Sequence, residues 1–163
     1  MGLWHRFDND QQRGDIARNV ASTPSGLGNL KTDEGLISAA QVSLGTDRRL
    51  PDGIDPPSGV SDDVRGWWGD RFWAGDFDVP EYQIGSLIWT LTRSKNRQQT
   101  LNLLGDFAVD AVQWMVRFGI IDRAEAVTER VRRDVGAFRL AMYRPDDLNP
   151  LWVPRWEVTI NGL

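Results

Sequence analysis

The sequence lacks cysteine altogether and has a single histidine among its 163 residues. Without cysteine there are no disulfides, thiolate metal sites or cysteine nucleophiles. His5 lies in a polar N-terminal stretch, so a Ser-His-Asp triad or a histidine-rich zinc site would need improbable placement around it. We therefore expect no histidine- or cysteine-based chemistry.

Long apolar runs and a basic surplus are missing too. No stretch approaches the ~18 apolar residues that a membrane-spanning helix needs, and residues 1–12 lack the apolar core of a signal peptide. The net charge is −4, and the basic residues are scattered along the chain. This distribution argues against nucleic acid as a principal partner. We expect neither a nucleic-acid nor a membrane partner.

The length fits one domain preceded by an arm. Residues 1–31 are rich in Asp, Asn, Gln, Gly and Ser, and STPSGLGN at 22–29 is typical of a turn-rich connector. We predict an N-terminal arm over 1–31, with an edge strand or weak order of its own. A single domain is expected over 32–163.

Helical periodicity marks the middle of the chain. TDEGLISAAQVSL, which starts at Thr32, has helical spacing, although its even positions also fit a strand. An apolar stripe predicts a short helix at about 83–95. The strongest pattern predicts a helix over 98–118, with Gly119 as its C-cap.

The apolar period changes to two after this helix. Strands are expected at 123–131, 138–143 and 155–160, with a turn in RRDVGA at 132–137. The sequence thus predicts an α+β domain: two to three helices packed on a small three- to four-stranded antiparallel sheet, with a long irregular loop between the first and second helix. The helix at 98–118 should cross one sheet face, leaving the other face and an edge strand to neighbours.

The irregular loop contains an unusual corner, RGWWGD at 65–70. Adjacent side chains of an extended segment point to opposite sides, so Trp67 and Trp68 should not both enter one core. We expect one to point inward and the other outward. The flanking glycines allow a sharp, fixed turn, across which Arg65 and Asp70 can pair.

Three roles stay open for the tryptophan pair: filling the protein's own core, stacking on a sugar, or anchoring a protein partner. A membrane anchor is disfavoured because no basic amphipathic helix accompanies the pair. Tryptophan and arginine are enriched at interface hot spots, which favours the protein partner. The candidate interface residues are Arg48, Arg49, Arg65, Trp67, Trp68 and Asp70.

Carboxylates are plentiful but form no recognisable catalytic or metal-binding set. Phage-type lysozymes show Glu, eight residues, Asp, five residues and Thr. Glu125 and Asp134 have the first spacing, but position 140 is Leu and Glu125 falls on a predicted strand. The loop aspartates match no EF-hand spacing, and there is no GxxxxGK[ST] phosphate loop. We expect no catalytic residues, metal or cofactor, although a hydrolase site of another pattern stays open.

Several segments, in their order along the chain, resemble a known family. They are DEGLISAAQVSLGTDRRL at 33–50, DDVRGWWGDRF at 62–72, GSLIWTLTRSKN at 85–96 and AVQWMVRFGI at 111–120. Together they resemble the Mu-like baseplate proteins of contractile-tailed bacteriophages. That family is related to the baseplate wedge and sheath-initiator proteins, whose domain is called lysozyme-like. The resemblance covers roughly residues 33–160.

The resemblance implies a non-enzymatic structural component of the tail baseplate. It implies several copies per baseplate, assembly with other wedge proteins and with tail sheath and tube proteins, and a part in sheath initiation at the tube–sheath junction. The location would be the virion, and the host bacterial cytoplasm during assembly. In sheath-initiator relatives, strands from neighbouring chains add to the small sheet. The alternative is a tail-associated peptidoglycan hydrolase (muramidase) or a glycan-binding tail module.

Overall fold

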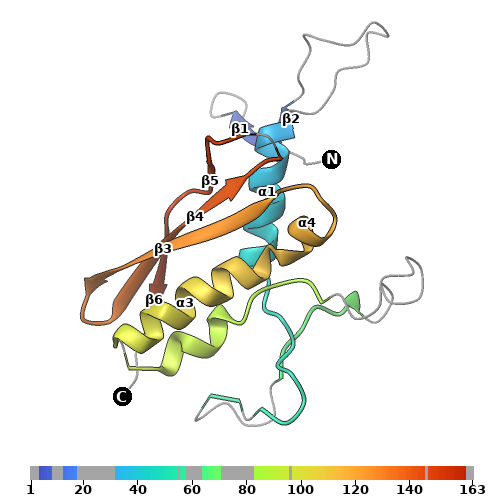
Figure 1. The fold of residues 1–163 in the computed structure, drawn as a ribbon. Coiled ribbons are helices and arrows are strands. Elements are labelled where there is room, and N and C mark those ends of the chain that lie inside the picture. The colour runs from blue at the N-terminus through green and yellow to red at the C-terminus, as the bar shows by residue number, and fades with distance from the viewer. Residues whose placement is uncertain are drawn as a thin grey trace, which may run out of the picture. The chain divides into compact units, whose positions relative to one another are not determined.

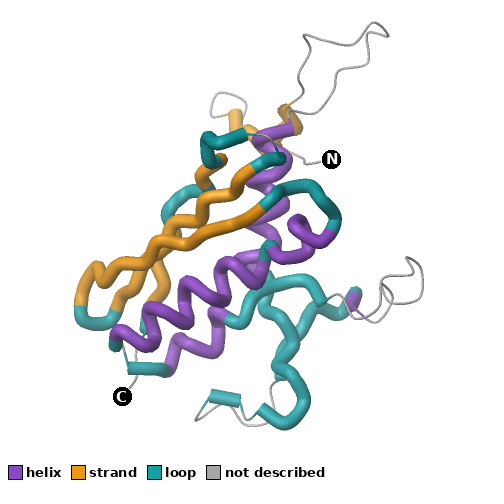
Figure 2. Tube along the Cα trace, in the orientation of Figure 1, coloured by secondary structure: helices purple, strands orange, loops and turns teal. Residues whose placement is uncertain are grey.

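A computed structural model describes residues 4–8, 13–17, 32–54, 56–57, 64–70, 83–95, 97–145 and 147–160. Residues 1–41 and 42–163 form two compact units, and each is described by itself (Figures 1 and 2). The first unit holds an antiparallel hairpin of β1 (Trp4–Asp8) and β2 (Arg13–Ala17), and most of α1 (Thr32–Gly45). The extent of the arm and of the domain after it stays a prediction.

Helix α1 confirms the helical interpretation of the segment after Thr32. Ala40, Ser43 and Leu44 are buried, at the three- and four-residue spacing of a helix face. Val42 is 55% exposed, although a strand with its even positions inward would have buried it.

The second unit is an α+β fold, as predicted (Figures 1 and 2). After the end of α1 come the 3-10 helix η1 (Ile88–Arg93), α3 (Gln98–Ala111), α4 (Gln113–Arg117), β3 (Arg123–Arg132), β4 (Val135–Tyr143), β5 (Leu151–Trp152) and β6 (Trp156–Thr159). The four strands form one antiparallel sheet with β4 in the centre. Strand β3 lies along one side of β4, while β6 and β5 pair in turn with its other side.

Helix α3 packs across β3 and β4, on the sheet face where the core lies (Figure 1). The approach is close: a Cβ on Gly136 would lie 3.0 Å from Leu101 Cδ2 and 3.4 Å from Leu104 Cδ2. Leu104 and Leu140 are fully buried. The predicted crossing of one sheet face by this helix is therefore confirmed.

The opposite sheet face carries charged side chains. Arg155 pairs with Glu129 of β3 at 2.8 Å and with Glu157 of β6, so it links the strands on both sides of β4. Val127, two residues before Glu129 on the same face of β3, is 62% exposed. Exposed ion pairs of this kind contribute little stability, at most about 1 kcal/mol each.

The predicted helix over 98–118 is present but interrupted. Val112 leaves helical geometry, with φ −108° and ψ 5°, and this separates α3 from α4. Gly119 terminates α4 as the sequence predicted, as the left-handed residue just after the C-cap Phe118. Its φ is +65°, its amide donates to Val116 O at 3.0 Å, and the Ile120 amide donates to Met115 O at 2.9 Å.

The helix predicted at 83–95 is wrong in length and type, because only Ile88–Arg93 is helical and its turns are 3-10. Gly85 has φ +115°, outside helical geometry. Ser86 pairs in parallel with Asp47, so its backbone is engaged elsewhere. A period-based prediction could not detect this long-range pairing.

The strand predictions are confirmed, with two differences. Strand β4 begins at Val135, three residues before the predicted start, because the turn uses only residues 133 and 134 between the paired Arg132 and Val135. Strand β5 was not predicted, since its two residues are too short to show a period. Over the described residues, no helix is long and apolar enough to cross a membrane.

Replacing Gly85 by alanine should destabilise the fold strongly. The new Cβ would lie 2.5 Å from Thr46 O at a φ of +115°. We expect a loss of about 2–3 kcal/mol in the free energy of unfolding, measured by urea denaturation. Gly53→Ala is the matched control, because φ is +84° there but nothing lies within 4 Å. Its loss should be about 1 kcal/mol; equal losses for both variants would contradict the close approach at Gly85.

Candidate protein-interaction site

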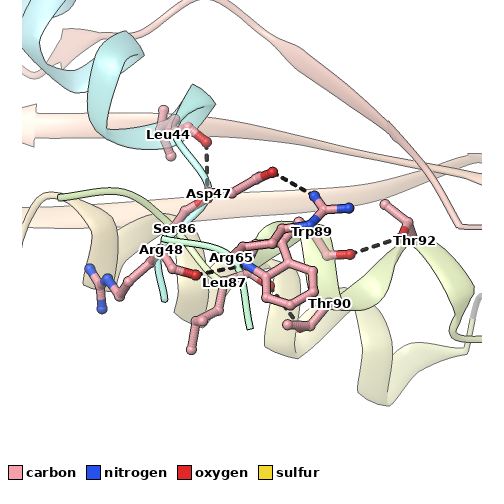
Figure 3. A network of polar contacts seen from close by, with 9 residues as sticks. All are labelled: Leu44, Asp47, Arg48, Arg65, Ser86, Leu87, Trp89, Thr90 and Thr92. Carbon is pink, nitrogen blue, oxygen red and sulfur yellow. Dashed lines mark hydrogen bonds and ion pairs between the residues drawn. The ribbon is translucent and has the colours of Figure 1, made fainter. Parts of the chain in front are cut away.

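The base of the site is a pairing between two segments far apart in the sequence (Figure 3). The Ser86 amide donates to Thr46 O at 2.9 Å, and the Arg48 amide donates to Ser86 O at 3.0 Å. The Ser86 hydroxyl donates to Leu44 O at 2.9 Å, and the residue is 2% exposed. These bonds fix the chain just after α1 against the chain just before η1.

Arg48 connects this pairing to helix α3. Its Nε donates to Gly85 O at 3.0 Å, its Nη1 forms an ion pair with Asp110 Oδ2, and its Nη2 donates to Asp110 O at 3.4 Å. The Arg48 side chain is only 18% exposed. Asp110 lies in the last turn of α3, where a cation also interacts favourably with the helix dipole.

Trp89 is the buried tryptophan of the site (Figure 3). It is 5% exposed, and its indole Nε1 donates to Arg48 O at 3.0 Å. The guanidinium carbon of Arg65 lies 4.5 Å from the centre of the Trp89 ring, within cation–π range. Arg65 Nη1 also pairs with Asp47. Arg65 therefore connects this base to the turn at residues 65–70, which we call the tryptophan corner.

The tryptophan corner projects from this base. Trp68 is 76% exposed and Trp67 is 36% exposed, with their ring centres 5.4 Å apart. Trp67 folds over Gly69, where an added Cβ would lie 2.2 Å from the ring. Gly66 has φ +106° and passes close to Arg49, as the sharp turn predicted from the glycines requires. Neither tryptophan fills the core, and Trp68 is the outward one.

Asp70 does not make the predicted pair with Arg65. Its Oδ1 accepts a hydrogen bond from the Ile84 amide at 3.2 Å, and its Oδ2 is buried without a hydrogen-bond partner in the described structure. Arg65 is directed toward Asp47 and Trp89 instead. Arg65 has φ +50° at the start of the turn.

The structure thus divides the candidate residues into two groups. Arg48 and Arg65 belong to the anchoring base, and Asp70 joins them by accepting a hydrogen bond from the Ile84 amide. The other three, Arg49, Trp67 and Trp68, project from it and are exposed. The sequence did not single out Asp47, Gly85, Ser86, Trp89 and Asp110. Trp89 lies within the segment predicted as a short helix, and nothing in the sequence marks Asp110 as the partner of Arg48.

The structure does not assemble the carboxylates considered for hydrolysis. Glu125 lies on β3 opposite Ala141, whereas Asp134 lies in the turn beyond the end of that strand. Arg132, at the end of β3, is seven positions beyond Glu125, which corresponds to roughly 20 Å or more along the strand. A glycosidase needs about 5–10 Å between its carboxyl groups. Among the described residues, no group of three or more His, Cys, Asp or Glu could hold a metal ion.

The chain is similar in sequence to proteins of one family. The family model described as "Phage protein GP46" matches residues 36–149. The chain is 34% identical over 134 residues to the "Baseplate protein gp46" of Escherichia phage Mu, with 82% of each chain covered. It is 29% identical over 121 residues to the "Mu-like prophage FluMu protein gp46" of Haemophilus influenzae, covering 74% of this chain and 77% of the relative.

The two kinds of tryptophan should separate in a stability measurement. Trp89→Ala removes a buried ring together with its hydrogen bond to Arg48 O and should cost about 3–5 kcal/mol. Trp68→Ala, at a 76% exposed position, should change stability by at most about 0.5 kcal/mol. Denaturant unfolding of the full chain measures both. A large loss for Trp68→Ala would mean that its ring is a structural part of the loop.

Proposed function

We propose, because the chain belongs to the phage protein GP46 family, that it is a structural component of the baseplate of a contractile phage tail. The observation that carries the proposal is the relationship to the phage Mu protein, which is named a baseplate protein and matches over most of both chains. The protein would act in several copies in the virion. Its assembly would take place in the cytoplasm of the host bacterium.

The tryptophan corner is the surface that we assign to another wedge protein. Trp68 is an exposed large aromatic on a turn anchored through Arg48 and Arg65. An anchored turn loses little conformational freedom on binding, and buried tryptophans contribute disproportionately to interface energy. Arg49, exposed beside Gly66, adds a guanidinium for a carboxylate on the partner.

The edge of β3 is a second surface, which we assign to strand addition. Strand β3 has ten residues and pairs with β4 on one side, and no other described strand pairs with its second side. An open edge of this length is a template for another chain, unless it is covered. We propose that a neighbour at the tube–sheath junction supplies that strand, and that the protein in this way helps the first sheath subunits to assemble.

We further propose that the protein is not an enzyme. The separation of Glu125, on β3, from Asp134, in the turn beyond the end of β3, supports this, because the two carboxylates cannot act on one glycosidic bond. No feature of the described residues favours the muramidase or the glycan-binding alternative over the baseplate role.

The proposed wedge contact is tested by co-expression with the other tail proteins of the same gene cluster. Trp68→Ala should reduce co-purification at least about tenfold, because an interface tryptophan typically contributes 2 kcal/mol or more. Trp152→Ala is the matched control, since this tryptophan is 47% exposed on β5, away from the corner. It should co-purify like the wild type.

Two results would count against this function. Retention of the wedge complex by Trp68→Ala would remove the corner from the interface. Clearing of a peptidoglycan suspension by the purified chain, abolished by a single glutamate-to-glutamine change, would favour a tail muramidase instead.

Strand addition is tested by hydrogen exchange. In the free chain, the β3 amides that point away from β4 should exchange rapidly, because no described strand accepts them. In purified tail particles the same amides should be protected at least about tenfold more. The central strand β4 is the internal reference and should be protected in both states. Unchanged exchange along β3 in particles would rule out a strand added at this edge.

A further inference from the structure

A polar pocket lies where α3 and α4 meet the segment that follows α1. Its volume is about 210 Å³, below the roughly 300–1,000 Å³ of typical small-molecule sites, so its size suits a single side chain of a partner. The segment after α1 and the two helices supply most of the lining: Arg48, Pro51, Asp110, Gln113, Trp114 and Arg117. The tryptophan corner and the edge of β3 contribute no residue to it.

The break between α3 and α4 still leaves three polar side chains on one side of the helical segment. Gln113 and Arg117 are four residues apart on α4, so they share one face of that helix. Asp110 stands in the last turn of α3, three residues before Gln113. Spacings of three and four residues keep side chains on the same side, and all three line the pocket.

Trp114 supplies a fixed apolar wall. Its indole Nε1 donates to Ser43 Oγ at 3.0 Å, and Ser43 is 1% exposed. This bond occupies the indole N–H, so the pocket receives the apolar surface of the ring. Phe118 lies beside Trp114, with ring centres 6.5 Å apart, and is 57% exposed. Apolar surface therefore remains uncovered next to the polar pocket.

Positive charge exceeds negative charge in the pocket, because Arg48 and Arg117 line it with one carboxylate, that of Asp110. Three of the five N–H groups of Arg48 donate to Gly85 O, Asp110 Oδ2 and Asp110 O, which leaves two for another acceptor. The Arg48 guanidinium is directed away from Trp89 and Arg65 (Figure 3).

Arg117 carries the charge that is not balanced. It is exposed, and its side chain forms no ion pair or hydrogen bond with the part of the chain that the structure describes. Asp110, the carboxylate of the pocket, is already paired with Arg48. The pocket thus offers one unpaired guanidinium, two further N–H groups of Arg48 and the amide of Gln113 to an acceptor.

We propose that this pocket binds the carboxylate of an aspartate or glutamate side chain of a partner protein. The carboxylate accepts hydrogen bonds from Arg117 and Arg48, and such charge-assisted bonds are roughly twice as strong as neutral ones. The surface of Trp114 and Phe118 covers the apolar stem of that side chain and an apolar neighbour beside it. The location of the partner in tail particles rests on the proposed function.

The test is a zero-length cross-link in purified tail particles. Arg117→Lys keeps the charge and places a primary amine in the pocket. A carbodiimide joins this amine to a touching carboxylate as an amide and takes up the water that is released. The chain has only Lys31 and Lys95 otherwise, so mass spectrometry can identify a product at position 117. We expect it to contain an Asp or Glu of another polypeptide.

Arg139→Lys is the matched control for the cross-link. Arg139 is exposed on the central strand β4, between the buried Phe138 and Leu140, and does not line the pocket. It should give no such product. The partner found at position 117 then serves as the probe for affinity. Arg117→Gln should weaken its binding at least about tenfold, which corresponds to roughly 1.4 kcal/mol, whereas Arg139→Gln should bind like the wild type.

Four results would overturn the proposal in particles that contain the chain. They are no product at position 117, a product with Asp110 of the same chain alone, equal yields from positions 117 and 139, and a small carboxylic acid at position 117 in place of a peptide. The last result would mean a site for free anions. Absence of the chain from tail particles would contradict the baseplate function itself, and the proposal would fall with it.

Discussion

The parallel pairing of Ser86 with the backbone around Asp47 is the constraint on which the candidate site depends. It joins the chain after α1 to the chain before η1, across about forty residues of sequence. Only glycine at position 85 permits the approach, because its φ is +115° and any Cβ would lie 2.5 Å from Thr46 O. With this pairing in place, Arg48 is held where it reaches Asp110 on α3.

The polar contacts around this pairing share a buried tryptophan. Trp89 donates to the Arg48 carbonyl and lies under the guanidinium of Arg65 (Figure 3). The Arg65 side chain is 36% exposed, so its contact with the ring contributes about 0.5–1 kcal/mol, similar to an exposed ion pair. The turn that begins at Arg65 is thereby anchored at its first residue, and Trp68 is presented to solvent on an ordered support.

The two faces of the sheet differ, because one packs in the core and the other is exposed to solvent. Gly136 and Gly105 let α3 approach β3 and β4 closely. The opposite face is covered by arginine–glutamate pairs, as across Arg155. This division leaves the long edge of β3 without a described partner strand.

The sequence by itself determined the features that depend on local periodicity: the helices around residues 32–44 and 98–118, the Gly119 cap, the strands and the α+β class. It also indicated that the RGWWGD corner is a fixed turn, since the glycines allow it. Tertiary structure decided which partner each charge takes, as in the pairing of Arg65 with Asp47 in place of Asp70. It also decided that Ser86 pairs with Asp47, so that the segment before Ile88 does not form a helix. Such contacts join residues tens of positions apart, and neither propensity nor period carries information on which distant groups will meet.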